Sequence, residues 1–375
     1  MDDTAMDSQE FAPEPQDLEQ ETPNEDIFKA PSIHPERILS GNSYTHYSGI
    51  PELVRKDMGT ECVLGVDEAG RGPVLGPMVY GIFYLPIPLH HSLLAETHHF
   101  DDSKVLTPAV RSALMQTLCT PDSPSTTPST TGSTLPSLYA SSGWATTLLS
   151  ARSISSHMLP PATSGPYNLN AQAMDATIEL ITGVLSRGVN VKEIYVDTIG
   201  RPETYQKKLE KIFPMCRVTV AKKADSLYPC VSAASVCAKV TRDAALEVLW
   251  EAYADEEAKG QNQSEDSPKQ KGDKGTKAAE PTWGSGYPSD ARCTAWMKRS
   301  MDPVFGWGAE TRFSWGTAKE MLEGKKGTSL AVEWPADEDP DSMKMTDFFV
   351  SGEEEKEEGG ELVSWYGRRV DEMVF

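Results

Sequence analysis

Residue types that can do chemistry on phosphate come together in the segment 63–73, Val-Leu-Gly-Val-Asp-Glu-Ala-Gly-Arg-Gly-Pro. Its adjacent carboxylates, Asp67 and Glu68, follow a short apolar stretch, which predicts a buried strand that ends where the acids begin. Carboxylates at a strand end are costly to bury unless they bind a cation or another partner. Glycines on either side of Arg71 let the backbone approach a ligand closely, and the Arg suits phosphate. The segment therefore predicts a nuclease or a phosphotransferase.

Two further acids occupy comparable places later in the chain. Asp197 ends a predicted strand at 194–196, and Asp225 precedes an Ala-rich stretch, 232–250, that predicts a helix. Taken alone, Asp197 fits a strand-end acid that caps the next turn, and Asp225 fits the N-cap of a helix. If all four acids cluster, they repel one another in the absence of metal, and the pKa of at least one of them should rise.

Net charge and cysteine content narrow the range of functions and cellular compartments that the protein can have. Residues 1–30 hold ten acids and one Lys, and residues 333–362 hold twelve acids and two Lys, so the ends carry nearly all of the −21 net charge. The body is close to neutral and can still gather basic residues on one face, while the acidic ends should weaken nonspecific contact with phosphate backbones. Six Cys without metal-binding spacing predict free thiols in a reducing compartment. No apolar run is long enough to span a membrane, and the acidic N-terminus resembles no targeting signal.

The elements that must position the acids alternate between strands and helices, which predicts an α/β domain. Strands are expected at 62–66, 78–85, 194–196 and 217–221, and helices at 108–118, 170–186, 202–213 and 232–250, with a last helix pair within 284–323. Biased composition at 120–138 and 251–281 predicts two flexible insertions. The expected organisation is a disordered tail 1–40, a catalytic domain 41–250, a helical C-terminal part 282–330 and an acidic tail 331–375.

The string Asp67-Glu68-Ala-Gly-Arg-Gly resembles the signature of the type 2 ribonucleases H. The eukaryotic catalytic A subunit is similar from about Cys62 to Lys319, including the strings around Asp197 and Asp225. The resemblance implies a ribonuclease H-like mixed sheet flanked by helices, with a helical C-terminal extension. It also implies that these four acids bind two Mg²⁺ ions, with Mn²⁺ as a substitute. In-line phosphodiester cleavage needs an activated water and a stabilised leaving oxygen, and two ions about 3.5–4 Å apart serve both.

The same resemblance implies how the substrate is recognised. In the family, the Gly-Arg-Gly loop, here Gly70, Arg71 and Gly72, reads the 2′-hydroxyl that distinguishes RNA from DNA. The string Gly-Ser-Gly-Tyr287-Pro matches a family motif whose Tyr favours an RNA-to-DNA junction, although Tyr287 alone fits an aromatic lid on a turn. Family positions that contact the nucleic-acid backbone correspond to Lys104, Ser232, Ser235, Lys239 and Arg242, and a solvated helix face is the alternative for Lys239 and Arg242.

An endonuclease of RNA/DNA hybrids is the function that the resemblance implies. It would hydrolyse the RNA strand and nick duplex DNA on the 5′ side of embedded ribonucleotides, leaving 5′-phosphates. It would work in the nucleus, in Okazaki primer removal and ribonucleotide excision repair, with two non-catalytic subunits in a heterotrimer. Rival hypotheses are a non-catalytic hybrid-binding scaffold and an ordinary two-metal DNA nuclease. The four acids oppose the scaffold, and the Gly-Arg-Gly loop with Tyr287 opposes the DNA nuclease, because DNA has no 2′-hydroxyl.

The tail segment 342–349, Ser-Met-Lys-Met-Thr-Asp-Phe-Phe, places two aromatics between acidic runs. Exposed aromatics in a polar tail indicate a docking segment. The segment resembles the sliding-clamp peptide of replication proteins: Met345, Phe348 and Phe349 match, while Ser342 occupies the position of a Gln. Clamp binding and docking on partner subunits are the two hypotheses for this segment.

Overall fold

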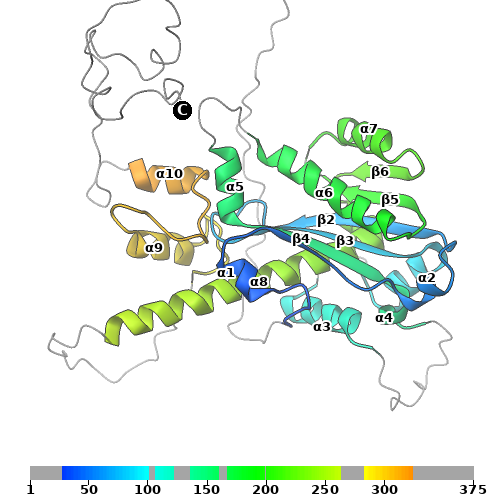
Figure 1. Ribbon diagram of the computed structural model, residues 1–375, viewed down its shortest axis with the longest axis horizontal. Helices are drawn as coiled ribbons and strands as arrows, with labels where there is room; N and C mark the ends of the chain where they lie inside the picture. The colour runs from blue at the N-terminus through cyan, green and yellow to red at the C-terminus, as the bar shows by residue number, and fades with distance from the viewer. Residues whose placement is uncertain are drawn as a thin grey trace, which may run out of the picture. The chain divides into compact units, whose positions relative to one another are not determined.

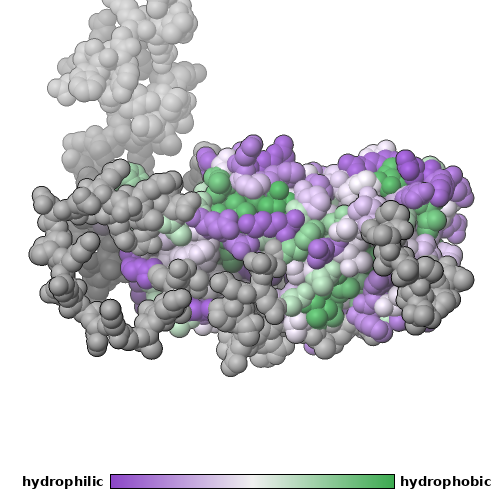
Figure 2. Space-filling model, turned by 90° about the horizontal axis from the view of Figure 1, so that it is seen from below, coloured by the Kyte–Doolittle hydropathy of each residue, from purple (hydrophilic) through white to green (hydrophobic). Residues whose placement is uncertain are grey.

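The computed structural model describes residues 28–100, 106–121, 136–159, 167–198, 200–262 and 283–323. They form a six-stranded mixed sheet with helices on both faces (Figure 1). The expected α/β class, a mixed sheet flanked by helices with a helical C-terminal part, is confirmed. None of the helices in these ranges is long and apolar enough to cross a membrane. The face shown in Figure 2 carries hydrophobic residues in separate small areas among hydrophilic ones.

The sheet changes from antiparallel to parallel at its central strand β2. The strand order is β1-β4-β3-β2-β5-β6, and β2 pairs antiparallel with β3 but parallel with β5. Parallel neighbours present their carboxyl ends at the same edge, so the ends of β2 and β5 lie side by side. The strands are β1 (Tyr44–Tyr47), β2 (Cys62–Ala69), β3 (Met78–Pro86), β4 (Gly143–Leu149), β5 (Val191–Asp197) and β6 (Arg217–Ala221).

Helices cover the two faces of the sheet unequally. The long helix α8 lies across one face together with α3, and α6 and α7 lie on the other (Figure 1). The helices are α1 (Pro35–Leu39), α2 (Glu52–Lys56), α3 (Pro108–Cys119), α4 (Leu138–Ser141), α5 (Ala151–Met158), α6 (Leu169–Ser186), α7 (Pro202–Ile212), α8 (Pro229–Asn262), α9 (Ala291–Ser300) and α10 (Gly316–Glu323), with short helical turns at Ile87–Leu89, Ser92–Thr97 and Ala224–Ser226.

The backbone of α8 packs directly on the sheet. A Cβ atom at Gly81 of β3 would lie 2.5 Å from the carbonyl oxygen of Ala234, so a side chain there would force the helix away. Ala233 and Cys237 are also fully buried on this side of the sheet. The Ala-rich sequence of α8 therefore serves close helix–sheet packing, which brings the first turns of the helix beneath the end of β2.

Four apolar clusters pack among the described residues, and three of them join the sheet and α8 to the surrounding helices. On one face, Leu64 and Val66 of β2 pack in the same cluster as Leu180 and Ile181 of α6. On the other, Val63, Phe83 and Leu85 pack with α3 and α8. A third cluster joins the C-terminal half of α8 to α9 through Leu246, Trp283 and Trp296. The C-terminal helical part is thus a satellite core built on α8, and not an independent domain.

The predicted end of the first strand is wrong. β2 continues through both acids to Ala69, because β3 supplies a regular partner for each residue: Gly81 pairs with Asp67, and Tyr80 pairs with Glu68. The strands β1 and β4 also went unpredicted. The sequence of β4, Gly-Trp-Ala-Thr-Thr-Leu-Leu, lacks strict alternation because the strand is buried on both faces.

Two expected boundaries also shift. Residues 28–40, assigned to the disordered tail, pack on the body: Phe28 N donates to Ser112 Oγ at 2.7 Å, and Tyr44 Oη donates to the carbonyl of Ser32 at 2.8 Å. Helix α8 runs to Asn262, past its expected end at 250, so the start of the charged insertion is helical. All six cysteines are free, as their spacing predicted.

Candidate active site

The four predicted acids gather where β2 and β5 end. Pairing between these strands stops at Val66 opposite Val196, so Asp67 and Glu68 border an open edge of β2. Asp197 is the last residue of β5. Asp225 lies in the Ala224–Ser226 turn, which leads from β6 into α8. The parallel pairing and the packing of α8 together bring acids that are far apart in sequence to one edge of the sheet.

Asp67 and Glu68 reach this edge from opposite faces of the sheet. The strand is regular at both residues, so their side chains alternate. Asp67 is 6% exposed and lies on the α8 side beside Ser235. Glu68 lies on the other side, where Tyr80 is its cross-strand neighbour and Arg71 is close enough to influence its pKa. The two carboxylates therefore flank the open edge, and no bulge is needed to bring them there.

Burial and mutual repulsion define the electrostatics of the site. Burial, and then the charges of Glu68, Asp197 and Asp225, raise the pKa of Asp67 well above its usual value, while Ser235 lowers it in part. Burial raises the pKa of Glu68 to about 7; Arg71 opposes this rise and Asp197 adds to it. The edge therefore concentrates more negative charge than the protein itself neutralises, which favours a bound cation.

The donor set fits a hard divalent cation. All four side chains offer carboxylate oxygens, the ligands preferred by Mg²⁺ and Mn²⁺. Within the described ranges, no three Asp, Glu, His or Cys side chains converge closely enough to hold one ion together. Mg²⁺ retains several waters and usually needs only one or two carboxylates per ion, so acids spread along an edge still suit it.

Backbone contacts orient the acids beyond β2. Ala224 N donates to Asp197 Oδ1 at 2.7 Å, and Ser226 N donates to Asp225 Oδ1 at 3.0 Å. The turn that presents the Ala224 amide begins at Lys223, whose φ of +56° is left-handed. Asp197 therefore caps the next turn, as the capping alternative expects. One carboxylate can both cap a turn and bind a cation, so this contact leaves the metal-binding prediction open.

The loop after β2 is held by the C-terminal part of the chain. Gly70 adopts φ +78°, and a Cβ there would lie 2.7 Å from the carbonyl oxygen of Pro77. Arg312 Nη2 donates to the carbonyl of Gly70 at 2.6 Å, and Trp315 Nε1 donates to that of Gly72 at 2.9 Å. Arg71 donates a hydrogen bond to Asn170 Oδ1 at the start of α6. These contacts fix the Gly-Arg-Gly loop beside the carboxylates.

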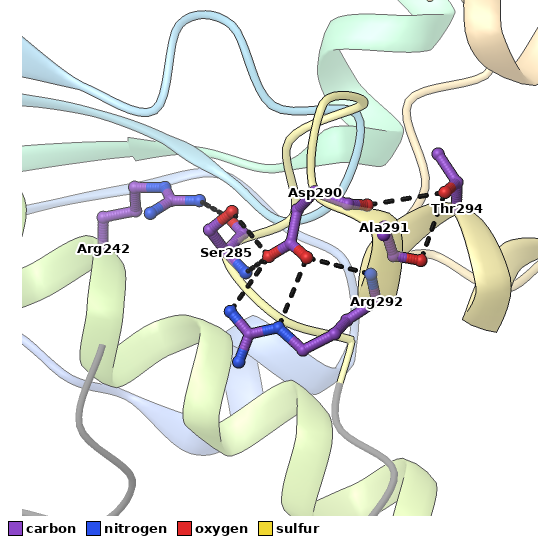
Figure 3. Close-up of polar contacts among 6 residues, drawn as sticks. All are labelled: Arg242, Ser285, Asp290, Ala291, Arg292 and Thr294. Carbon is purple, nitrogen blue, oxygen red and sulfur yellow. Dashed lines mark hydrogen bonds and ion pairs between the residues drawn. The ribbon is translucent and has the colours of Figure 1, made fainter. Parts of the chain in front are cut away.

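The Tyr287 loop is tied to the same structure. Asp290 Oδ2 accepts from Ser285 N at 2.9 Å, and Arg242 Nη2 donates to the carbonyl of Ser285 at 2.8 Å (Figure 3). Val74 N donates to the carbonyl of Gly286 at 2.9 Å, which joins this loop to the segment after Gly72. The two loops that the sequence singled out therefore form one connected surface feature.

The other predicted contact residues occupy different depths. Ser232 and Ser235 are 0% and 1% exposed, so both lie away from a surface that a duplex could touch, and Ser235 lies beside Asp67. The Arg242 side chain is buried against Gly70 and lies 5.9 Å from the Tyr287 ring centroid. Lys239 is half-buried. Lys104, Met345, Phe348 and Phe349 lie outside the described residues.

Several residues of the site were missed from the sequence. Tyr80 and Tyr205 lie near Glu68 on the α6 side, and burial raises the pKa of both phenols. Asn170 and Arg312 support the Gly-Arg-Gly loop. Only Tyr80 had a sequence signal, because it lies opposite Glu68 if the two strands pair with a tight connection. The partners of the others lie too far along the chain for any local pattern to reveal them.

Carboxylates at adjacent strand ends of a mixed sheet, beside a glycine loop, are the arrangement expected of a nuclease of ribonuclease H type. The sequence matches the family described as Ribonuclease HII over residues 64–274. The chain belongs to this family. It is similar to the A subunit of ribonuclease H2 from Neurospora crassa, at 52% identity over 341 residues that cover 91% of this chain and 94% of that protein.

Two more distant relatives carry the same name. The A subunit of ribonuclease H2 from Schizosaccharomyces pombe is 39% identical over 93% of this chain and 91% of that protein. The Homo sapiens protein is 40% identical over 81% of this chain and 86% of that protein. The predicted family is confirmed: the chain is a ribonuclease H endonuclease, which hydrolyses the RNA strand of RNA/DNA hybrids.

Proposed function

We propose that this endonuclease is the catalytic subunit of a heterotrimer, which nicks duplex DNA on the 5′ side of embedded ribonucleotides. It acts in the nucleus, in Okazaki primer removal and in ribonucleotide excision repair. The observation that carries the proposal is the backbone bond from Val74, just after the Gly70–Gly72 loop, to Gly286 of the Tyr287 loop, close to the carboxylates. An enzyme that reads a junction needs a 2′-hydroxyl reader and a deoxysugar reader at a fixed separation.

The four carboxylates Asp67, Glu68, Asp197 and Asp225 would hold two Mg²⁺ ions, for which Mn²⁺ can substitute. When bound, the ions supply an activated water and stabilise the leaving oxygen. The chain contributes a buried, preorganised cluster of negative charge that needs little rearrangement during the reaction. Arg71, on the Glu68 side, offers a fixed positive charge for a phosphate next to the cleavage point.

Substrate contacts come from both sides of this edge. Backbone groups of Gly70, Arg71 and Gly72 would read the 2′-hydroxyl, and Tyr287 would pack on the deoxyribose beyond the junction. Lys104 and Lys239 would neutralise phosphates and set the register of the duplex. Ser232, Ser235 and Arg242 are candidates for indirect roles, because all three are buried away from phosphate; Ser235 lies beside Asp67, and Arg242 contacts the two loops.

A duplex DNA with a single ribonucleotide tests the proposal. The full chain, with and without co-expressed partners, is incubated with this duplex in Mg²⁺, beside an Asp67→Asn/Asp197→Asn control. One nick 5′ of the ribonucleotide, absent in the control, supports the junction-reading enzyme. Cleavage that requires the partners adds the obligate complex. Tight hybrid binding without any cleavage would instead favour the scaffold hypothesis.

Partner binding is the second part of the proposal. The relatives are each named as one lettered subunit of ribonuclease H2, which indicates that those proteins have further subunits. For the segment 342–349 we propose docking on a sliding clamp through Met345, Phe348 and Phe349, with partner subunits as the rival. A clamp pull-down with Phe348→Ala/Phe349→Ala that retains full binding would reject the clamp. Loss of co-purifying subunits in the same variant would favour the rival.

A further inference from the structure

Arg312 is buried completely beneath the Gly-Arg-Gly loop. Its guanidinium donates to three backbone carbonyls of one loop: Gly70 at 2.6 Å, Arg71 at 3.0 Å and Gly76 at 3.0 Å. The side chain is 0% exposed, so no water replaces these contacts. Three hydrogen bonds from one rigid planar fork define the path of the loop more tightly than three separate donors would.

Trp315 completes this support. Its indole Nε1 donates to the carbonyl of Gly72 at 2.9 Å, and its ring lies 4.7 Å from the Arg312 guanidinium carbon. Arg312 and Trp315 therefore bind the carbonyls of Gly70, Arg71 and Gly72 as one unit, which we term the loop brace. The guanidinium cation and the face of the indole ring attract each other, which holds the two side chains together.

The brace decides which groups of the loop face outward. In a trans peptide the N–H points away from its carbonyl, and the described residues contain no cis peptide. Since the carbonyls of Gly70 and Arg71 turn toward the brace, the N–H groups of Arg71 and Gly72 turn away from it. Outward N–H donors are what a backbone reader of a sugar hydroxyl requires.

The charge of the brace adds to its geometry. Arg312 forms no ion pair with another described residue, and the acceptors of its guanidinium are neutral carbonyls. Burial, and then Arg242, lower the pKa of Arg312 to about 9, so it stays charged at neutral pH. A buried cation without a carboxylate partner is costly. Its field polarises the loop peptides and strengthens their N–H groups as donors.

We propose that the loop brace, Arg312 with Trp315, sets the preference for RNA over DNA by presenting the Arg71 and Gly72 amides to the 2′-hydroxyl. The proposal rests on the function proposed above for the Gly70–Gly72 loop. Both residues are positioning residues, because they act through the loop and touch no reacting atom.

The test compares binding of an RNA/DNA hybrid and a DNA duplex of the same sequence. Full-length protein with co-expressed partners carries Asp67→Asn to prevent cleavage, and fluorescence anisotropy gives both affinities. The variants are Arg312→Gln, which removes the charge and the fork, Arg312→Lys, which keeps only the charge, and Trp315→Phe, which keeps the ring but not the N–H. Arg299→Gln, an exposed residue of α9, is the matched control.

The hybrid-to-DNA affinity ratio is the deciding quantity. We expect it to fall about tenfold for Arg312→Gln, by less for Arg312→Lys, and about threefold for Trp315→Phe. The affinity for DNA and the Arg299→Gln ratio should stay unchanged. In the cleaving background, KM for the hybrid should rise more than kcat falls, whereas a merely structural defect lowers the active fraction and leaves KM and the ratio unaltered.

Two results would overturn the inference, and a third concerns the proposed function instead. An unchanged ratio in folded Arg312→Gln contradicts the brace. If Arg312→Gln does not fold, an unchanged ratio in Trp315→Phe contradicts it instead. If the protein with the native brace shows no preference for the hybrid, the proposed role of the Gly70–Gly72 loop fails. This preference is therefore measured before any brace variant is tested.

Discussion

At Asp67, burial and three neighbouring carboxylates all act against ionisation. The metal-free protein therefore carries a cost in stability at the residues proposed to bind metal, which is a common origin of a trade-off between stability and activity. The same repulsion would favour the binding of a cation. Stability without metal and catalysis with metal should thus respond in opposite directions to the loss of one charge.

Replacing Asp67 tests this opposition. Asp67→Asn should raise the free energy of unfolding in EDTA by about 1–3 kcal/mol, because one repelling charge is gone. The same change should lower hybrid cleavage at least about a thousandfold. Denaturant titration and a gel cleavage assay measure the two effects. Exposed Glu61→Gln is the control. Destabilisation of the metal-free protein by Asp67→Asn would contradict the prediction.

The pKa of Glu68 predicts a pH dependence. The folded state raises this pKa from 4.5 to about 7, so the folded protein binds the proton more tightly than the unfolded chain does. Metal-free stability should therefore fall as pH rises from about 4.5 through 7, by an amount on the order of 1–3 kcal/mol. Mg²⁺ relieves the repulsion, so its increment in Tm should be larger at pH 8 than at pH 6. If Mg²⁺ raised Tm equally at pH 6 and pH 8, the predicted coupling between Glu68 ionisation and metal binding would be contradicted.

Gly70 combines a left-handed φ with crowding. Ala at this position would place Cβ 2.6 Å from Arg242 Cδ and 2.7 Å from the Pro77 carbonyl oxygen, at φ +78°. We expect Gly70→Ala to lower the free energy of unfolding by about 1–3 kcal/mol and to raise KM for the hybrid. Gly49→Ala, where a Cβ meets nothing within 4 Å, is the matched control. Thermal unfolding and steady-state kinetics decide, and a Gly70→Ala protein with normal KM would contradict the prediction.

Among the elements, the short loop 284–288 depends on the start of α9. Asp290 caps that helix and accepts from Ser285 N and Arg292 N, both at 2.9 Å. Burial alone would raise the pKa of Asp290, but these bonds and the Arg292 side chain lower it to about 2. The carboxylate is therefore charged at neutral pH and fixes the loop that carries Tyr287.

Removing this cap should affect both stability and selectivity. Asp290→Ala should cost about 1–2 kcal/mol in the free energy of unfolding, as lost N-caps do. It should also reduce the preference for a junction over a uniform hybrid, because Tyr287 loses its fixed position. Asp302→Ala removes a comparable backbone cap from the 302–306 turn and is the control. Competition cleavage of the two substrates measures the preference. An equal change in substrate preference in Asp290→Ala and Asp302→Ala would contradict a specific role for Asp290 in positioning Tyr287.

Local sequence patterns predicted the presence of helices and strands better than the residues at which they begin and end. The strands at 78–85 and 217–221 and the helix at 202–213 agree with β3, β6 and α7 within a residue, because their apolar pattern reports their own burial. The predicted end of β2 was wrong because pairing with β3 extends the strand. The strand β4 was missed because burial on both faces removes the alternation of apolar and polar residues. The four acids could be picked out from the sequence motifs around them. Their position at one edge of the sheet depends on strand pairing, which no local sequence pattern reveals.

The brace marks the limit of sequence reasoning about the site. Arg312 and Trp315 lie in a stretch without biased composition, and their partners are more than 230 residues away. A buried Arg also contradicts the usual expectation that Arg is exposed. Only the three-dimensional structure connects this stretch to the Gly-Arg-Gly loop.

For the whole molecule, charge is separated between the body and the ends. Deleting residues 331–375 removes the whole acidic run 333–362, so the remaining protein should bind plain DNA several-fold more tightly at low salt. The slope of affinity against salt should persist, because the contacts of the body are unchanged. Anisotropy titrations at several NaCl concentrations measure both quantities. Unaltered or weaker DNA binding by the truncated chain would contradict this role for the tail.

The reach of the brace has a consequence for biosynthesis. The four carboxylates have all been translated once residue 225 is made, whereas Arg312 must find carbonyls up to 242 residues earlier in the chain. A nascent chain therefore acquires its acids long before the Gly70–Gly72 loop is held in place by Arg312. Translation that stops before residue 310 would yield a protein with every acid and no brace. If the loop brace acts as proposed above, such a chain should discriminate less between RNA and DNA than the full chain does.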